Sequence, residues 1–443
     1  MNDSPVQPLY VRAKSEISRD FPFEGDLFER NALATRLTQL LERLPDGGVI
    51  AIDAPWGEGK TWFGNRWHAT LVKEGFRSTI INCFEHDYLE DPFLMIAGEL
   101  LELNKARQSA AQSKLLEASK RVTFALLPAA TKLGINALGR VVLGTSNISE
   151  DLAELGEKIQ ESAAEGLEKL VSKRLEEFEA NKKNMNGFRK TLEEMAAEQA
   201  KPIVIFLDEL DRCRPDFAVR TLERIKHFFD VPGIVFVLLM NKQQLAASVE
   251  GIYGPINADA YLGKFIQLSL TLPKRLSFIR GNRDDNRSFC EKTLERFGFT
   301  NIDTNHDFSL IMGSLATYFS LSLRDIERAV VLYSIAQPLN ASSAIVAWPI
   351  ALKLADPDLF RKLIADDITA HQKAASLCAE ISGRVRDLEA TFTFFIELHG
   401  KRASLSDEPY TTETRQFLGM LGSRTANAFL AWIFERVDLA VKL

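Results

Sequence analysis

The stretch that decides the fold is an apolar run that leads into a short glycine-bearing segment. It reads Gly48-Val-Ile-Ala-Ile-Asp-Ala-Pro-Trp-Gly-Glu-Gly-Lys-Thr61, and a helical pattern over Trp62 to Lys73 follows it. Gly57 and Gly59 let the backbone turn tightly, so that successive N–H groups can point inward at an anion. Strand, loop and helix in this order form the setting in which a loop binds phosphate at a helix N-terminus.

The residues of this loop have the chemistry of nucleotide binding. Lys60 supplies a positive charge between phosphates, and the Thr61 hydroxyl is a ligand for Mg²⁺. Ala54 stands where the pattern GxxxxGK[ST] has its first glycine, which is tolerated if its φ is negative. For the loop alone, a glycine-rich turn with an incidental lysine is the alternative. We expect nucleotide contacts from Pro55, Trp56, Gly57, Glu58, Gly59, Lys60, Thr61 and Trp62.

A second apolar run ends in two acids and removes most of that ambiguity. It reads Ile203-Val-Ile-Phe-Leu-Asp208-Glu209. In this position the first carboxylate, Asp208, is expected to hold Mg²⁺, usually through water. The second, Glu209, lies farther out and is expected to orient and deprotonate the attacking water. The two elements together predict a P-loop NTPase that binds ATP, or a close relative, with Mg²⁺ and hydrolyses it.

Apolar runs elsewhere in the chain indicate the strands of one sheet. Most are continuous rather than alternating, which is typical of strands buried on both faces of a parallel sheet. Helical patterns stand between them, so we predict a three-layer α/β fold. The predicted strands are Gly48 to Ala54, Ser78 to Phe84, Ile203 to Leu207, Ile234 to Met240 and Phe265 to Leu272.

The regions outside the sheet read as helical. A stretch from about 103 to 200 is rich in Ala, Glu, Lys and Leu and is predicted to be a helical insertion, too short and too irregular for a long coiled-coil arm. After Pro273 the strand signals stop, and segments such as Leu315 to Ala336 and Ala375 to Leu398 look helical. We therefore expect a P-loop domain over 1–275, a helical lid over 276–345 and a helical C-terminal region over 346–443.

Polar residues after the strands offer further candidates. Asn241 would lie beside Asp208 if the fourth predicted strand is inserted between the first and the third. Its side chain could then hold the attacking water or the γ-phosphate. An asparagine in a turn at a strand end is the equal alternative. Arg212 is adjacent to Asp211 and could pair with it, whereas Arg220 and Arg224 lie four apart and are expected on a solvated face.

Composition bears on the partners and the location of the protein. Lys and Arg total 54 against 60 Asp and Glu in 443 residues, so the chain has no basic excess of the kind that indicates nucleic-acid binding. A local basic groove stays an open possibility. Four cysteines lie far apart without a CxxC pair, which fits a reducing cytosol and a cytoplasmic location. The apolar stretch Val122 to Ser149 is interrupted by Lys132 and Arg140. We expect a helical hairpin there; association with the membrane surface is the lesser alternative.

Several motifs resemble the KAP family of P-loop NTPases. They are WGEGKT, INCFEHD, FLDELDRCRPD, the run Asp259 to Gln267 and LSLRDIER. The resemblance covers Gly25 to Tyr333 apart from the insertion, and implies an additional-strand P-loop domain with helical insertions. Many members carry transmembrane helices in the insertion, and many bacterial members are implicated in phage defence. Two positions depart from the family pattern. Glu209 stands where the family often has Asp, and a glutamate there favours hydrolysis. Asn241 also stands where the family often has Asp.

The helix that contains LSLRDIER holds a candidate for a cation at the γ-phosphate. Ser322 is a plausible N-cap, with Asp325 closing a capping box, which places Arg324 in the first turn. The family resemblance aligns this helix with the sensor arginine of related NTPases. Arg328, one turn on, is the second candidate, and pairing of Arg324 with a surface carboxylate is the alternative.

Together these features predict Mg²⁺-dependent ATP hydrolysis that drives a conformational change. By resemblance, the expected setting is a bacterial defence or signalling assembly with protein partners, and a homo-oligomer is also open. A scaffold that binds nucleotide with negligible turnover is the main alternative. A kinase is the weaker one, because Glu209 favours water over a substrate hydroxyl.

Overall fold

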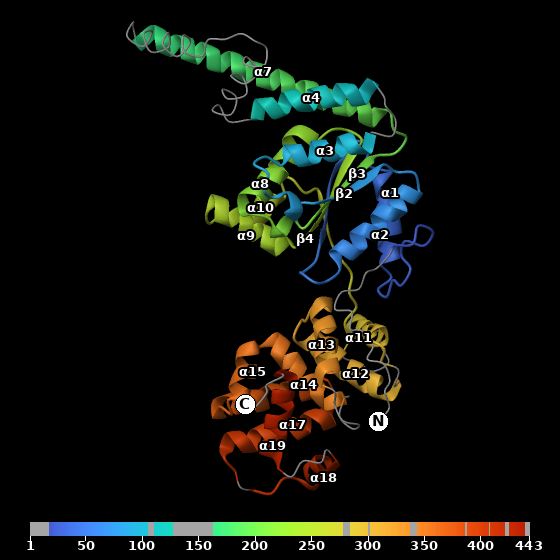
Figure 1. The fold of residues 1–443 in the computed structure, drawn as a ribbon, viewed down its shortest axis with the longest axis vertical. Coiled ribbons are helices and arrows are strands. Elements are labelled where there is room, and N and C mark those ends of the chain that lie inside the picture. The colour runs from blue at the N-terminus through green and yellow to red at the C-terminus, as the bar shows by residue number, and fades with distance from the viewer. Residues whose placement is uncertain are drawn as a thin grey trace, which may run out of the picture.

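The computed structural model places a layered α/β unit between a pair of long helices and a helical unit (Figure 1). It describes residues 17–104, 110–126, 163–277, 284–299, 302–336, 343–385, 388–406, 408–420 and 425–438. The α/β unit contains the glycine-bearing loop. Its sheet therefore decides where the residues expected to bind nucleotide lie.

The sheet is parallel and has the strand order β2-β3-β4-β1-β5. Every residue of β3 and β4 is buried, which explains why their sequences are apolar without alternation. β4 lies between β1 and β3, which is the arrangement that would bring Asn241 near Asp208. The strands are β1 (Gly48–Asp53), β2 (Ser78–Asn82), β3 (Ile203–Asp208), β4 (Ile234–Met240) and β5 (Leu268–Thr271).

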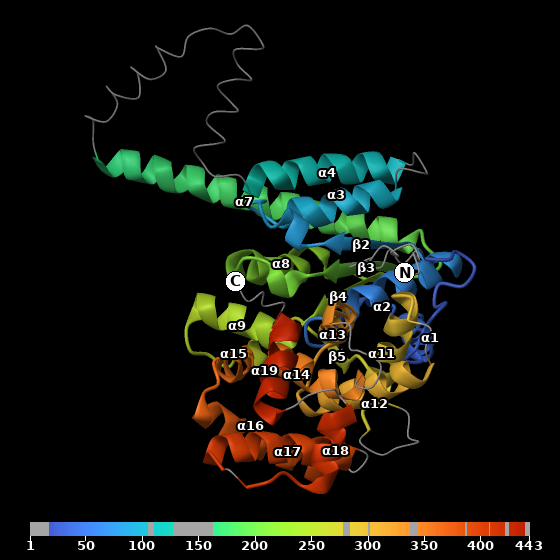
Figure 2. The same cartoon turned by 60° about the horizontal axis from the view of Figure 1, so that its bottom comes forward.

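Helices cover both faces of the sheet and make three layers (Figures 1 and 2). Alternate strand residues enter two separate cores, so that Ile50 and Phe206 face one side and Ala51 and Leu207 the other. The first core is closed by α1 (Arg30–Leu41) and α2 (Lys60–Lys73). The second is closed by α3 (Phe93–Asn104), α8 (Pro215–Arg224), the π-helical η4 (Ile225–Phe229) and α9 (Lys242–Tyr253). The α/β prediction is confirmed.

The described part of the insertion after α3 contains two helices that lie side by side, α4 (Ala110–Leu126) and α7 (Ala163–Ala197) (Figures 1 and 2). α7 has 35 residues and is about 52 Å long at 1.5 Å per residue, so it is longer and more regular than the sequence pattern indicated. Its C-terminal half is anchored by Phe188, whose ring meets Phe93 at 5.0 Å and Phe229 at 5.5 Å. Most of the stretch Val122 to Ser149 lies outside the described residues. None of the described helices is long and apolar enough to cross a bilayer.

The helical unit after the sheet has one continuous hydrophobic core. Residues from both the predicted lid and the predicted C-terminal region enter it, including Leu315, Val330, Trp348 and Phe434. The division at 345 remains a prediction, and the core crosses it. The helices are α11 (Asp285–Arg296), α12 (Ile302–Tyr318), α13 (Leu323–Ala336), α14 (Ser343–Ala355), α15 (Pro357–Ile364), α16 (Ile368–Arg384), α17 (Glu389–Ser404), α18 (Thr412–Met420) and α19 (Ala426–Asp438).

Two helical segments expected from the sequence are each divided in the structure. Leu315 to Ala336 spans the end of α12 and all of α13, because Ser320 adopts a left-handed φ of 55° between them. Ala375 to Leu398 spans α16 and α17. Val385 and Leu388 stay buried through that break, so the apolar pattern continues although the helix does not.

Candidate functional site

The loop between β1 and α2 has the geometry of a phosphate-binding loop. Gly57 and Gly59 have φ of 84° and 81°, a region that L-residues rarely adopt, and Gly59 forms the N-cap of α2. Ala54 is buried and is not among the positive-φ residues, so alanine is tolerated at the first position of the motif as expected. The loop therefore presents the N-terminus of α2 to an anion.

Lys60 is buried within the loop at 8% exposure. Its Nζ donates to the carbonyl oxygens of Ala54 at 2.6 Å and Pro55 at 3.1 Å. Burial lowers the pKa of the Lys60 ammonium, and the carboxylate of Asp211 and then that of Asp208 partly offset this. The ammonium thus lies close to the acids at and after the end of β3.

Asp208 and Thr61, the two residues expected to hold Mg²⁺, are in contact. Asp208 is 5% exposed, and its carboxylate accepts a hydrogen bond from the Thr61 hydroxyl. Burial raises the pKa of Asp208, so a cation beside it would be stabilising. Among the described residues no three His, Cys, Asp or Glu side chains are grouped to hold a metal. Mg²⁺ needs only one or two protein oxygens when phosphates and water supply the rest, so the donor set fits.

Glu209 is held in an unusual backbone conformation directly after β3. Its φ of 59° is left-handed, which costs about 1–2 kcal/mol for a residue other than glycine. Its N–H donates to Asp208 Oδ1 at 2.9 Å, and it opens the short helix η3 (Leu210–Arg212). Its carboxylate forms an ion pair with Arg212 Nη1 at 2.7 Å. Strain of this kind is often found at functional sites.

These residues line one cavity of about 1070 Å³ at the carboxyl end of the sheet. Lys60, Thr61, Asp208 and Glu209 all contribute to its wall. From the loop, Trp56, Gly57, Gly59 and Trp62 also line it, whereas Pro55 and Glu58 do not. The opposite wall comes from the helical unit and includes Arg296, Arg324 and Arg328.

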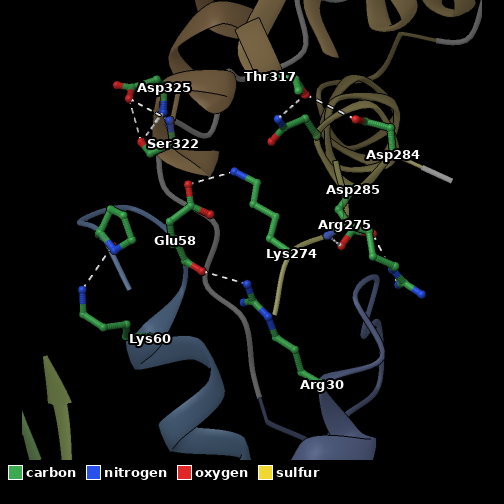
Figure 3. Close-up of polar contacts among 12 residues, drawn as sticks. Arg30, Glu58, Lys60, Lys274, Arg275, Asp284, Asp285, Thr317, Ser322 and Asp325 are labelled. Carbon is green, nitrogen blue, oxygen red and sulfur yellow. Dashed lines mark hydrogen bonds and ion pairs between the residues drawn. The ribbon is translucent and has the colours of Figure 1, made fainter. Parts of the chain in front are cut away.

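The side chain of Glu58 points away from Lys60 and toward Lys274 (Figure 3). Its Oε1 lies 2.8 Å from Lys274 Nζ, and both side chains are nearly buried. Its backbone oxygen accepts from Arg30 Nη2 at 3.0 Å. Arg30 is itself buried over the ring of Phe28, and burial lowers the pKa of its guanidinium to about 10. Arg30 and Lys274 thus both contact Glu58 of the loop, and no sequence motif indicated either of them.

The N-terminus of α13 contacts the loop directly. The Arg324 N–H donates to the carbonyl oxygen of Gly57 at 3.3 Å. A Cβ at Gly57 would lie 2.6 Å from Ser322 Oγ, so glycine is needed there for this approach. The capping box is present, because Asp325 N–H donates to Ser322 Oγ and Ser322 N–H to Asp325 Oδ2, both at 3.2 Å. Arg324 is exposed in the cavity wall, whereas Arg328 pairs with Asp325 at 3.1 Å.

Asn241 is not in the cavity wall, although β4 occupies the position that would bring it near Asp208. Its Oδ1 accepts from the N–H groups of Gln243 at 3.1 Å and Gln244 at 3.4 Å. It is therefore the N-cap of α9. A catalytic role for Asn241 stays a prediction that its contacts do not favour.

The arginines that follow β3 have other partners than the sequence indicated. Arg212 pairs with Glu209 at 2.7 Å, whereas the carboxylate of the adjacent Asp211 accepts a hydrogen bond from Trp56 Nε1 at 2.5 Å. Arg220 is exposed, as expected for a solvated face, whereas Arg224 is partly buried. Both reach the segment before α3: Arg220 donates to the carbonyl of residue 90 at 3.2 Å, and Arg224 pairs with the carboxylate of residue 91.

Comparison with known proteins assigns the family. No curated protein matches the sequence. A solved structure described as the Aeropyrum pernix ORC2 protein in ADPNP and ADP complexes is similar at 12% identity over 97% of each chain. Its TM-score of 0.36 is too low for that similarity to carry a conclusion. The family model described as "KAP family P-loop domain" matches residues 30–340, which is more than half of the chain. The chain therefore belongs to the KAP family of P-loop NTPases.

Proposed function

We propose that the chain binds ATP, or a closely related NTP, with Mg²⁺ and hydrolyses it. The observation that carries this proposal is the cavity in which Lys60, Thr61, Asp208 and Glu209 meet at the carboxyl end of a parallel sheet. Ligands of open α/β sheets bind at this end of the strands. The loop, α2 and the arginines of the helical unit surround the same space with groups suited to phosphate.

Each residue has a separate part in this reaction. Lys60 exchanges its two carbonyl partners for oxygens of the β- and γ-phosphates. Thr61 and Asp208 would hold Mg²⁺, which neutralises part of the phosphate charge when bound. Glu209 accepts a proton from water as the water oxygen bonds to the γ-phosphorus. The bond to the β–γ bridging oxygen breaks, and ADP and phosphate leave.

Arg324 is the proposed cation at the γ-phosphate. It lies in the cavity wall, and its backbone is bonded to the loop at Gly57. A guanidinium there would neutralise charge that develops on the γ-oxygens. Asn241 is a weaker candidate, because its side-chain oxygen already caps α9.

The proposed setting is a cytoplasmic bacterial defence or signalling assembly with protein partners. Membership of the KAP family supports it, through the resemblance of the loop and strand motifs. The four cysteines are buried and free, which fits a reducing compartment. In such an assembly ATP turnover would change the position of the helical unit, whose α13 contacts the loop.

A nucleotide-binding scaffold with little turnover is the second candidate. It is favoured by the ion pair between Glu209 and Arg212, which occupies the proposed base. Release of more than one phosphate per chain under multiple-turnover conditions separates the two candidates, since a scaffold would release less than one.

Two substitutions test the assignment of roles. Lys60→Ala is expected to abolish tight ATP binding, because the lysine contacts ground-state phosphates. Glu209→Gln is expected to bind ATP as the parent does and to lose about 10²–10⁴-fold in turnover. Lys182→Ala and Glu250→Gln change exposed side chains on α7 and α9 and serve as matched controls. Parent-like turnover by Glu209→Gln would show that Glu209 is not the base.

A further inference from the structure

We propose that Arg212 is a positioning residue that restrains Glu209, and that their ion pair lowers the rate of ATP turnover by reducing the share of chains in which the Glu209 carboxylate is free. Glu209 matters in this way only under the proposed function, in which it is the base. The pair joins Glu209 Oε1 to Arg212 Nη1 at 2.7 Å. A general base must be within hydrogen-bond reach of its proton, so the guanidinium competes with water for the Glu209 carboxylate.

The backbone of Glu209 is fixed, so that the restraint acts on the side chain alone. Its N–H is bonded to Asp208 Oδ1 at 2.9 Å. Its carbonyl oxygen accepts from Arg212 N–H at 3.0 Å and from Cys213 Sγ at 3.5 Å. With these three contacts and a left-handed φ, the residue is not expected to swing as a whole. Rotation of the carboxylate away from Arg212 is sufficient to free it.

The surroundings of Arg212 allow the pair to open. Its side chain is 34% exposed and that of Glu209 is 19% exposed, and ion pairs this close to solvent are weak. Asp211 accepts a hydrogen bond from Trp56 and is 7% exposed, so its carboxylate is engaged elsewhere. Arg212 lines the cavity together with Lys60, and its charge helps to lower the pKa of Lys60. The guanidinium therefore has open space beside it when Glu209 leaves.

The test is steady-state ATP turnover by Arg212→Gln in the full chain. The kcat is expected to rise about two- to fivefold, the range for loss of a partly exposed ion pair, while KM stays within about twofold. Salt screens exposed charges, so the kcat of the parent at saturating ATP should rise with ionic strength and that of Arg212→Gln should not. Arg212→Lys keeps a charge and is expected to give a rate between the two.

The controls separate this proposal from the proposed function. Arg43→Gln removes an exposed arginine after α1, before the sheet begins, and should behave as the parent. A kcat of Arg212→Gln that equals or falls below that of the parent, with Glu209→Gln inactive, overturns the restraint and leaves Glu209 as the base. Absence of turnover in the parent and in Arg212→Gln, or equal turnover in Glu209→Gln, overturns both.

Discussion

Replacement of Lys274 by Met is expected to lower the free energy of unfolding by about 3–5 kcal/mol, because it leaves Glu58 buried without its partner. The Lys274 and Glu58 side chains are 15% and 11% exposed and their charges lie 2.8 Å apart. At an effective dielectric constant of about 20, the attraction at this distance is about 6 kcal/mol before desolvation is counted. The other carboxylate oxygen of Glu58 is buried and has no hydrogen-bond partner, so loss of Lys274 leaves both oxygens bare.

The guanidinium of Arg30 is expected to keep the loss of unfolding free energy at the lower end of this range. Arg30 is buried close enough to Glu58 for the carboxylate to raise its pKa against the effect of burial. Arg30 also keeps its bond to the Glu58 carbonyl when Lys274 is removed. We therefore expect a loss near 3 kcal/mol and not 5.

Urea titration followed by tryptophan fluorescence and circular dichroism measures this loss. Trp67 is fully buried against the sheet and reports on the α/β unit that contains the loop. The double variant Glu58→Gln with Lys274→Met should be more stable than Lys274→Met alone, because the buried carboxylate charge of residue 58 is then also removed. Lys292→Met removes an exposed partner of Glu295 and should change stability by less than about 1 kcal/mol. A loss for Lys274→Met as small as that control, or a double variant less stable than the single one, would refute the reasoning.

Two further changes have defined outcomes. Arg324→Ala is expected to lower ATP turnover by about 10³-fold or more. Rescue of turnover on mixing with Lys60→Ala would show that the arginine acts across subunits. Parent-like turnover at every protein concentration would show that Arg324 is not part of the site. Burial, with the charge of His371, lowers the pKa of His399 to about 3, so its neutral form contributes stability that is present above about pH 6.5 and lost as the pH falls towards 3. The parent should lose about 2 kcal/mol between pH 6.5 and pH 5 from this group, and His399→Phe should not; equal losses in urea titrations at the two pH values would contradict this.

The sheet and the loop were predictable because their signals are local. Continuous apolar runs mark strands buried on both faces, and β3 and β4 are buried at every residue. The glycines of the loop and the acids after β3 follow directly on those runs. In a parallel sheet the carboxyl ends of strands meet at one edge, and Asp208 and Asp53 pair with neighbouring residues at the end of β4.

Side-chain partners were less predictable, because they depend on the backbone direction after each strand. Arg212 follows Asp211 in the chain, but the left-handed φ at Glu209 starts a tight turn that brings Glu209 and Arg212 together three residues apart. The side-chain oxygen of Asn241 accepts hydrogen bonds from N–H groups in the first turn of α9, which have no partner within the helix. Neither outcome follows from spacing alone.

The support of the loop from distant segments was not predictable. Arg30 lies before β1, and Lys274 follows β5, yet both reach Glu58. Pairing over 28 and 216 residues has no periodic signal in the sequence. Glu58 was expected to contact nucleotide, and no pattern in the sequence indicated that its side chain would be buried against Lys274.

The contact between Gly57 and the first turn of α13 connects the phosphate-binding loop to the whole helical unit. α13 carries the hydrogen bond to Gly57 and belongs to the core that the helices from α11 to α19 share. Close-packed cores move as rigid bodies and do not deform piece by piece. A displacement of the loop by fractions of an ångström would therefore tilt all of these helices together, and the largest travel would occur at α16 to α18, farthest from the sheet (Figures 1 and 2).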